Sequence, residues 1–187
     1  MIIGISGKKG SGKDTLGNFI INNSCIIFEP KKFADKLKQV TSIMLNVPIE
    51  DCYTDEGKAR YIDDLKMTNG QFQQKLGTDA IRNNIHEDAW AIFLFREYTK
   101  DKNWVVTDVR FENEASIIKH YGGILIRVNR DFVLEDGRDN NHPSETALDN
   151  YTEWDHIYDN NGSLNDMRAF VFNELLPKYQ LIKKFSW

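Results

Sequence analysis

Residues 7–13 are the part of the chain whose types and spacing most clearly predict chemistry. They read Gly-Lys-Lys-Gly-Ser-Gly-Lys and fit the pattern G-x-x-x-x-G-K of a phosphate-binding loop. Glycines let the backbone turn tightly, so that successive N–H groups point inward and bind phosphate oxygens. The following helix adds the positive end of its dipole. These residues predict a nucleotide-phosphate site that consists of Gly7, Gly10, Ser11, Gly12, Lys13, Asp14 and Thr15.

The residue after the lysine departs from the common pattern. Asp14 stands where Ser or Thr usually helps to hold Mg²⁺, and Thr15 follows it with a hydroxyl that can contact a phosphate. The pattern itself therefore leaves the magnesium ligands open. A glycine-rich turn with a lysine by chance is the structural alternative, but the flanking strand and helix argue against it.

A second pair of charged residues follows residues 104–107, which read as a strand. Asp108 lies at its carboxyl end, where ligands bind in open α/β sheets, and Arg110 comes two residues later. The aspartate can hold Mg²⁺ or an acceptor hydroxyl, and the arginine can clamp a phosphate. An exposed ion pair that caps the next helix is the alternative. Asp108 has no carboxylate beside it to activate water, which favours transfer to a bound acceptor over hydrolysis.

Several further candidates lie outside these two segments. Arginines at 127, 130 and 138 flank a polar loop over about residues 130–150, and such arginines can neutralise charge on a transferring phosphoryl group. His142-Pro143-Ser144-Glu145 can start a helix, with Ser144 as its N-cap and Glu145 in its first turn. Trp90 is more often a core residue than a platform for a base.

The elements that must position these residues alternate along the chain. Apolar runs predict strands at 2–6, 25–28, 104–107, 123–128 and 156–159, and helical spacing predicts helices at 13–22, 30–45, 71–84, 87–99, 112–121 and 163–176. Residues 46–69 are polar and predict an irregular or partly helical excursion. This alternation predicts an α/β fold, a central parallel sheet covered on both faces, as a single domain over residues 1–187.

The composition is that of an ordinary globular protein. The chain has 187 residues, 41% hydrophobic and 28% charged, with a net charge of −4. A general affinity for nucleic acid polymers or acidic membranes is therefore not expected. Residues 1–7 read as a first strand and not as a secretory signal, and no apolar stretch is long enough to span a membrane. Cys25 and Cys52 are expected to be reduced thiols in a cytoplasmic protein.

Several segments, in the same order, resemble phage-type deoxynucleoside monophosphate kinases. The resemblance extends from residue 6 to residue 164, and in this family the Gly-Lys-Asp-Thr variant of the loop is typical. The matching segments are residues 6–15, 76–79 with Asn83, Asn84 and Trp90, 108–115, 142–145 and 159–164. The ordered set is much more specific than the phosphate-binding loop alone.

This resemblance implies a three-layer P-loop kinase fold with a helical acceptor-binding region over about 30–100 and a lid over about 130–150. It implies transfer of the ATP γ-phosphate, with Mg²⁺, to deoxynucleoside 5′-monophosphates for DNA precursor synthesis, in the host cytoplasm if the chain is phage-encoded. Lys13, Arg110, Asp108 and Arg130 would be catalytic, and Asp14 and Asp108 would hold the metal. The acceptor would be bound by Lys9, Lys38, Gln71, Arg82, Trp90 and Arg110.

Other assignments remain open at the level of sequence. Gln71 falls near where relatives carry an arginine, and residues 46–69 are shorter than in the longest relatives, so the base preference is not predicted. Animal-type phosphomevalonate kinases share a Gly-Lys-Asp loop and a His-x-Ser-Glu cluster, and a non-catalytic ATP sensor is a rival from another class. The partners expected are small nucleotides. The apolar residues 90–95 can serve a homodimer interface or the core, and the core is the preferred interpretation.

Overall fold

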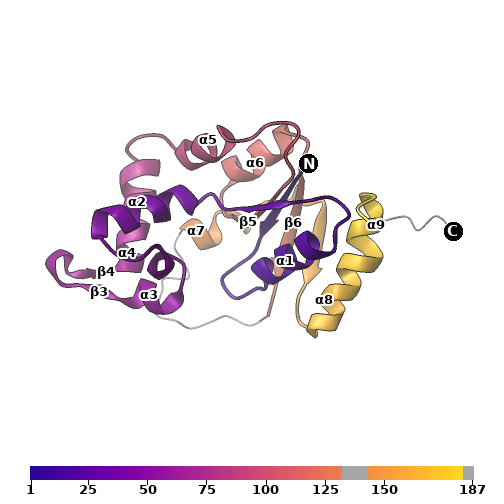
Figure 1. Ribbon diagram of the computed structural model, residues 1–187, viewed down its shortest axis with the longest axis horizontal. Coiled ribbons are helices and arrows are strands. Elements are labelled where there is room, and N and C mark those ends of the chain that lie inside the picture. Colours follow the sequence, from indigo (N-terminus) through magenta and orange to yellow (C-terminus); the bar gives the residue numbers. More distant parts are fainter. Residues whose placement is uncertain (132–142, 183–187) are drawn as a thin grey trace. The chain divides into compact units, whose positions relative to one another are not determined.

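The computed structural model describes residues 1–131 and 143–182 (Figure 1). The chain forms two compact units. Unit 1 contains Met1–Lys32 and Thr99–Trp187, and unit 2 is the continuous segment Phe33–Tyr98. The second unit covers nearly the range expected for the acceptor-binding region, but its role in binding stays a prediction.

Unit 1 is built on a parallel sheet with the strand order β2-β5-β1-β6-β7. The strands are β1 (Ile2–Ser6), β2 (Glu29–Lys31), β5 (Trp104–Val109), β6 (Ile124–Asn129) and β7 (His156–Asp159). All residues of β1 and β5 are buried, because the interior strands of a parallel sheet are covered on both faces. The predicted α/β fold with a central parallel sheet is confirmed.

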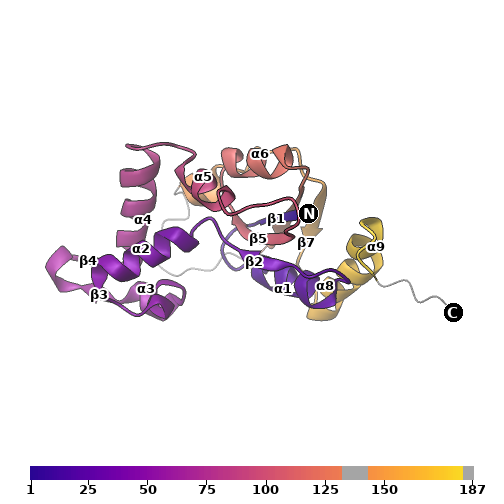
Figure 2. The ribbon, with the colours of Figure 1, turned by 45° about the horizontal axis from the view of Figure 1, so that its top comes forward.

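Alternate side chains of β1 face opposite layers, as the two-residue period of a strand requires. Ile3 and Ile5 belong to the core cluster that contains Leu16 and Ile20 of helix α1 (Lys13–Asn23). On the opposite face a Cβ added to Gly4 would lie 2.6 Å from Ile118 Cδ1 of helix α6 (Glu112–His120). Helices therefore cover both faces of the sheet, which Figure 2 shows with α6 on one side and α1 on the other.

The remaining helices of unit 1 lie in the second half of the chain. Met167, Phe170, Val171, Leu175 and Leu176 join the α1 side of the core. They belong to a continuous helical run over residues 164–178, which agrees closely with the predicted helix at 163–176. A short helix lies earlier in the chain. The segments are α7 (Pro143–Thr146), α8 (Leu164–Phe170), the π-helical segment η4 (Val171–Leu175) and α9 (Leu176–Lys178).

Two element predictions near residue 30 are wrong. The strand placed at 25–28 is at Glu29–Lys31, where Glu29 pairs in register with Trp104 of β5. The apolar side chains that suggested the earlier position are not all buried, and Ile27 is 88% exposed. The helix expected from residue 30 begins at Asp35, because Pro30 and Lys31 belong to the strand.

Unit 2 is mainly helical. Its elements are α2 (Asp35–Leu45), η1 (Ile49–Cys52), α3 (Asp55–Ala59), β3 (Tyr61–Ile62), η2 (Asp63–Leu65), β4 (Met67–Thr68), α4 (Asn69–Gln74), the π-helical segment η3 (Lys75–Arg82) and α5 (Ala89–Phe95). Within the excursion 46–69 the sequence did not predict the antiparallel pair of β3 and β4. Two-residue strands carry too little periodicity to be recognised.

The apolar residues of α5 are used in packing. Trp90, Ala91, Leu94 and Phe95 are buried, and the core interpretation of residues 90–95 is confirmed, although Ile92 is 37% exposed. Phe33 packs against Phe95, with 6.3 Å between the ring centroids. Among the helices of the described residues, none is long and apolar enough to cross a membrane.

Candidate functional site

The 7–13 loop connects the central strand β1 to α1 and turns sharply at two glycines. Gly10 and Gly12 have positive φ angles of 75° and 94°, which glycine adopts without strain. The Ser11 N–H donates to the Lys8 carbonyl over 3.1 Å and closes the turn. A Cβ on Gly12 would lie 2.4 Å from Asn160 Nδ2, and this amide donates to the Ser11 carbonyl over 2.8 Å. A side chain at residue 12 would therefore break the packing of the loop.

Lys13 is the first residue of α1, and its side chain lies inside the loop. The residue is only 8% exposed, and Nζ donates to the Lys8 carbonyl over 3.4 Å. Burial, followed by the neighbouring charge of Arg110, lowers the pKa of Lys13. The carboxylates of Asp14, Glu145 and Asp108 act in the opposite direction. A buried cation that these charges influence is suited to hold an anionic ligand.

Asp14 has a cation and a hydroxyl as partners. Its Oδ1 accepts from Lys32 Nζ and from Thr107 Oγ1, each over 2.7 Å. Burial alone would raise the pKa of Asp14, but the hydrogen bonds from Lys32 and Thr107 and the charges of Lys32 and Lys13 outweigh it and lower the pKa. Asp14 is therefore held as a carboxylate beside the loop.

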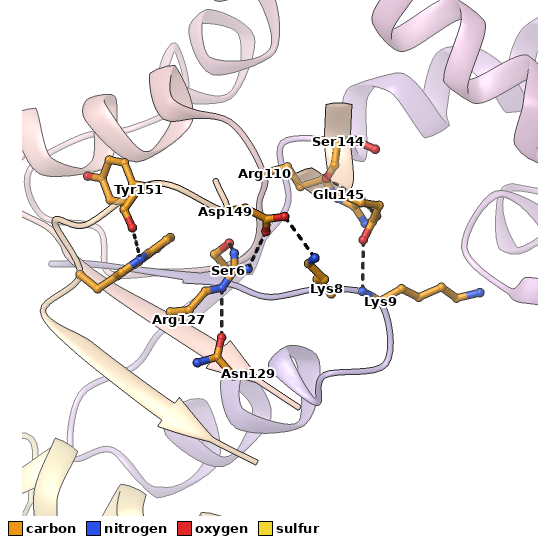
Figure 3. Close-up of polar contacts among 11 residues, drawn as sticks. Ser6, Lys8, Lys9, Arg110, Arg127, Asn129, Ser144, Glu145, Asp149 and Tyr151 are labelled. Atoms are coloured by element: carbon orange, nitrogen blue, oxygen red, sulfur yellow. Dashed lines mark hydrogen bonds and ion pairs between the residues drawn. The ribbon is translucent and has the colours of Figure 1, made fainter. Parts of the chain in front are cut away.

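Asp108 and Arg110 lie at the carboxyl end of β5, next to β1. Asp108 is 9% exposed. The Arg110 guanidinium donates to Glu145 Oε1, and its Nη1 also donates to the Ser144 carbonyl over 3.2 Å (Figure 3). The expected alternative of an Asp108–Arg110 ion pair does not describe the structure, because the partner of Arg110 is Glu145 from α7.

The segment 143–149 contacts the 7–13 loop through two carboxylates. Glu145 Oε2 accepts from the Lys9 N–H over 3.2 Å, while in Figure 3 the Lys9 side chain extends away from the other labelled residues. Asp149 accepts from Lys8 Nζ over 3.1 Å and from Arg127 over 3.3 Å. Two of the loop's residues are thus bound to a segment more than 130 positions later in the chain.

Two sequence predictions in this region need comment. Ser144 was expected to cap a helix, but α7 begins at Pro143, so Ser144 lies within the helix and that prediction is wrong. The predicted helix start itself is confirmed, with Glu145 in its first turn.

Arg138 and His142 lie outside the described residues. Arg130 donates to the Gly10 carbonyl over 3.2 Å, which places its guanidinium at the loop.

The candidates in unit 2 make contacts within that unit. Lys38 is buried, and its Nζ lies 3.8 Å from the centroid of the Tyr53 ring. The Gln71 side chain accepts from the Thr68 N–H over 2.8 Å, and the Thr68 hydroxyl accepts from the Gln71 N–H over 3.2 Å. Together they form a capping box at the start of α4. Arg82 donates to the Glu87 carbonyl over 2.7 Å.

Trp90 has both a packing role and access to a cavity. Its indole Nε1 donates to the Gly77 carbonyl over 2.9 Å, and its ring meets Phe93 edge to face. The cavity, of about 470 Å³, is lined by Lys36, Val40, Leu76, Ile81, Trp90, Phe93, Arg96 and Glu97. The residues predicted to bind an acceptor therefore carry structural contacts of their own, and their role in binding remains a prediction.

Magnesium was expected at Asp14 and Asp108. No group of three or more His, Cys, Asp or Glu side chains suited to a metal occurs in residues 1–131 and 143–182. Mg²⁺ on a kinase nevertheless needs only one or two carboxylates, since substrate phosphates and water complete its shell. The Asp14 carboxylate and the neighbouring Thr107 hydroxyl can supply oxygen ligands to Mg²⁺. Lys32 holds the carboxylate in place.

The sequence analysis predicted no contact with the loop or with Asp14 for four residues of the site. Lys32 contacts Asp14, Asn160 contacts the loop backbone, and Asp149 and Glu145 contact Lys8 and Lys9. Glu145 was noticed as part of a helix start and, like Asn160, within a segment that resembles the family. A usable signal existed for Asn160, because it follows β7 directly and carboxyl ends of parallel strands share one edge of the sheet.

Two comparisons with known proteins identify the family of the chain. The family model of deoxynucleotide monophosphate kinase matches residues 58–171, a segment that includes Asp108, Arg110 and Glu145 but begins after the 7–13 loop. A protein of Acanthamoeba polyphaga mimivirus that is named as a deoxynucleotide monophosphate kinase is 31% identical over 189 residues. That similarity covers 92% of this chain and 95% of the relative, and therefore includes most of both units. The chain belongs to the deoxynucleotide monophosphate kinase family, and it is a nucleotide kinase, a phosphotransferase.

Proposed function

We propose that the chain transfers the γ-phosphoryl group of ATP to deoxynucleoside 5′-monophosphates, and that the diphosphates formed serve DNA precursor synthesis. The observation that carries this proposal is the buried ammonium of Lys13 within the turn of the 7–13 loop, with Arg110 close enough to lower its pKa. Two cations at the edge of a parallel sheet suit a ligand with several phosphate charges. The family implies ATP as the donor.

Each charged residue of unit 1 has a role in this proposal. Loop amides and Lys13 bind the donor phosphates, while Arg110 and Arg130 stabilise the charge that spreads over the transferred group. Asp14 and Asp108 would hold Mg²⁺, which when bound neutralises charge on the β- and γ-phosphates. Since the acceptor is already a phosphate oxyanion near neutral pH, no strong general base is required. The step is direct in-line displacement: the acceptor oxygen bonds to the γ-phosphorus and the bond to the ADP oxygen breaks.

The acceptor contacts are proposed residue by residue from the resemblance to the family. Lys9 would touch the acceptor phosphate, together with Arg110, and the resemblance to the family supports this role. In unit 2, Lys38, Arg82, Gln71 and Trp90 would contact the acceptor. A lid over about 130–150 would exclude water and suppress ATP hydrolysis. The possible homodimer and the cytoplasmic location stay predictions.

A coupled assay of ADP release tests the proposed function directly. The purified chain is given ATP, Mg²⁺ and, in turn, each of the four deoxynucleoside monophosphates, the ribonucleotides and phosphomevalonate. We expect acceleration by at least one deoxynucleoside monophosphate and none by phosphomevalonate. Acceleration only by phosphomevalonate, or by no acceptor, would contradict the proposal, and the second result would favour a sensor that binds ATP without transfer.

A further inference from the structure

Glu145 places a carboxylate within the candidate phosphate site. Its Oε2 accepts from the backbone N–H of Lys9, and its Oε1 accepts from the Arg110 guanidinium (Figure 3). A loop amide and an arginine are the donors that phosphate oxygens use in such sites. One side chain therefore satisfies two donors of the candidate phosphate site.

The electrostatic surroundings of Glu145 agree with this geometry. The negative charge of Glu145 is among the influences that raise the pKa of Lys13, against the effects of burial and of Arg110. The Glu145 side chain is 18% exposed, so water screens the carboxylate only in part. The carboxylate thus compensates the positive charge of Arg110 and Lys13, as a bound phosphate group would.

The segment that carries Glu145 has a separate attachment. Asp149 accepts from Lys8 Nζ and from Arg127, and Arg127 also donates to Ser6 Oγ over 3.3 Å. Within α7 and the turn after it, the Ala147 N–H donates to the Pro143 carbonyl over 2.9 Å. Rotation of the Glu145 side chain would leave these contacts in place. Glu145 can therefore be displaced without release of the segment.

We propose that Glu145 is an internal anion that holds the Lys9 N–H and Arg110 in the absence of nucleotide, and that a nucleotide phosphate binds by displacing it. This inference rests on the proposed function only in that the ligand is a nucleotide phosphate. Displacement separates an ion pair and exposes the carboxylate to water, and the remaining negative charge repels the phosphate. Glu145 is thus a positioning residue that weakens nucleotide binding. A ligand without a phosphate group has no anion with which to displace it.

The test is the affinity of Glu145→Gln for ATP and ADP, measured by calorimetry without acceptor. Glutamine has nearly the same shape but no charge, so competition with the phosphate is weaker. We expect the Kd of both nucleotides to fall by about tenfold, the effect expected from removing a competing hydrogen bond to a charged group. Glu174→Gln is the matched control, because it makes the same charge change at an exposed residue of η4, and its Kd is expected to equal that of the wild type.

A purely structural role for Glu145 predicts the opposite sign. If the carboxylate serves only to orient Arg110, Glu145→Gln binds ATP more weakly than the wild type, and this result would overturn the inference. Thermal unfolding without nucleotide shows whether the variant is folded, and Glu145→Asp is the second variant if it is not. The shorter aspartate cannot reach both donors, and we expect it to bind ATP more tightly than the wild type as well.

Steady-state kinetics separates this inference from the proposed function. We expect Glu145→Gln to lower the KM for ATP with a smaller change in kcat, since the residue is absent from the phosphate site once nucleotide is bound. An unchanged or raised KM for ATP would count against displacement. If no acceptor is phosphorylated but Glu145→Gln still tightens ATP binding, the inference stands and the proposed function fails.

Discussion

The two units hold their candidate site residues in different ways. In unit 1, Lys8 and Lys13 of the loop meet Arg110 and Glu145, which come from distant parts of the chain, at the carboxyl edge of the sheet. In unit 2, Gln71 is bonded to Thr68, Arg82 to the Glu87 carbonyl and Trp90 to the Gly77 carbonyl, all within one continuous segment of the chain. Charged groups that converge from separate segments of the chain indicate a site organised by the fold, whereas the candidates of unit 2 also make structural contacts within that unit.

This difference leads to a general expectation about variants. Substitutions at the loop of unit 1 should change chemistry more than stability, because the loop's backbone turn is set by glycines and by Asn160. Substitutions at the candidates of unit 2 should change stability whether or not they contact a substrate. The following experiments test this contrast, beginning with the largest expected effect.

Lys13→Ala should have the largest effect on activity. Loss of the buried ammonium removes stabilisation of the transferring phosphoryl group, and we expect kcat to fall by about 10³-fold. Its pKa is already lowered by burial, so the folded protein should keep its stability in thermal unfolding. Lys100→Ala, at an exposed lysine of the described chain, is the control and should be unchanged. Near-normal turnover of Lys13→Ala would refute its assigned role.

Trp90→Ala should have the largest effect on stability. The side chain is 8% exposed and its indole donates to Gly77, so we expect the free energy of unfolding in urea to fall by about 3–5 kcal/mol. Ile92→Ala, at a 37% exposed residue of the same helix, should cost far less. A Trp90→Ala protein of normal stability with a raised KM for the acceptor would show that this residue serves binding alone and would weaken the contrast between the units.

The capping box of α4 offers a smaller test. Thr68→Ala removes the side chain that accepts from the Gln71 N–H, and we expect a loss of about 1 kcal/mol in the free energy of unfolding. Gln71→Ala removes the other half of the box and should cost less. Both are measured by urea denaturation together with the acceptor KM. If Gln71→Ala raises that KM and Thr68→Ala does not, Gln71 contacts the acceptor as well as the helix.

The smallest expected effect is a dependence of stability on pH through Asp14. Its folded pKa lies below the ordinary value of 3.8, so the carboxylate adds stability above that value and loses it as the pH falls through the lower folded pKa. Solvent screens this contribution, since the Asp14 side chain is 56% exposed. We expect Asp14→Asn to flatten the acid side of a stability–pH curve between about pH 5 and 2. An unchanged slope would mean that Lys32 and Thr107 do not stabilise the carboxylate.

The sequence by itself determined the loop, the interior strands and the charged residues at their ends. Residues 7–13 carry a motif whose spacing is local, and the buried runs of β1 and β5 are unmistakable because a strand covered on both faces is apolar throughout. Prediction was weakest for short elements such as β2 and the β3–β4 pair, where a few residues carry no clear period.

Only the tertiary structure decided which of these residues meet. The order β2-β5-β1-β6-β7 places the carboxyl ends of β5 and β6 on either side of the loop that follows β1. Arg110 and Arg130 thereby reach the loop region, and Glu145 bonds to Lys9 across 136 positions of sequence. Spacing along the chain carries no information about such contacts, because they depend on strand order and on the path of the intervening segments. The loop was readable from sequence, whereas the carboxylate that occupies two of its donors was not.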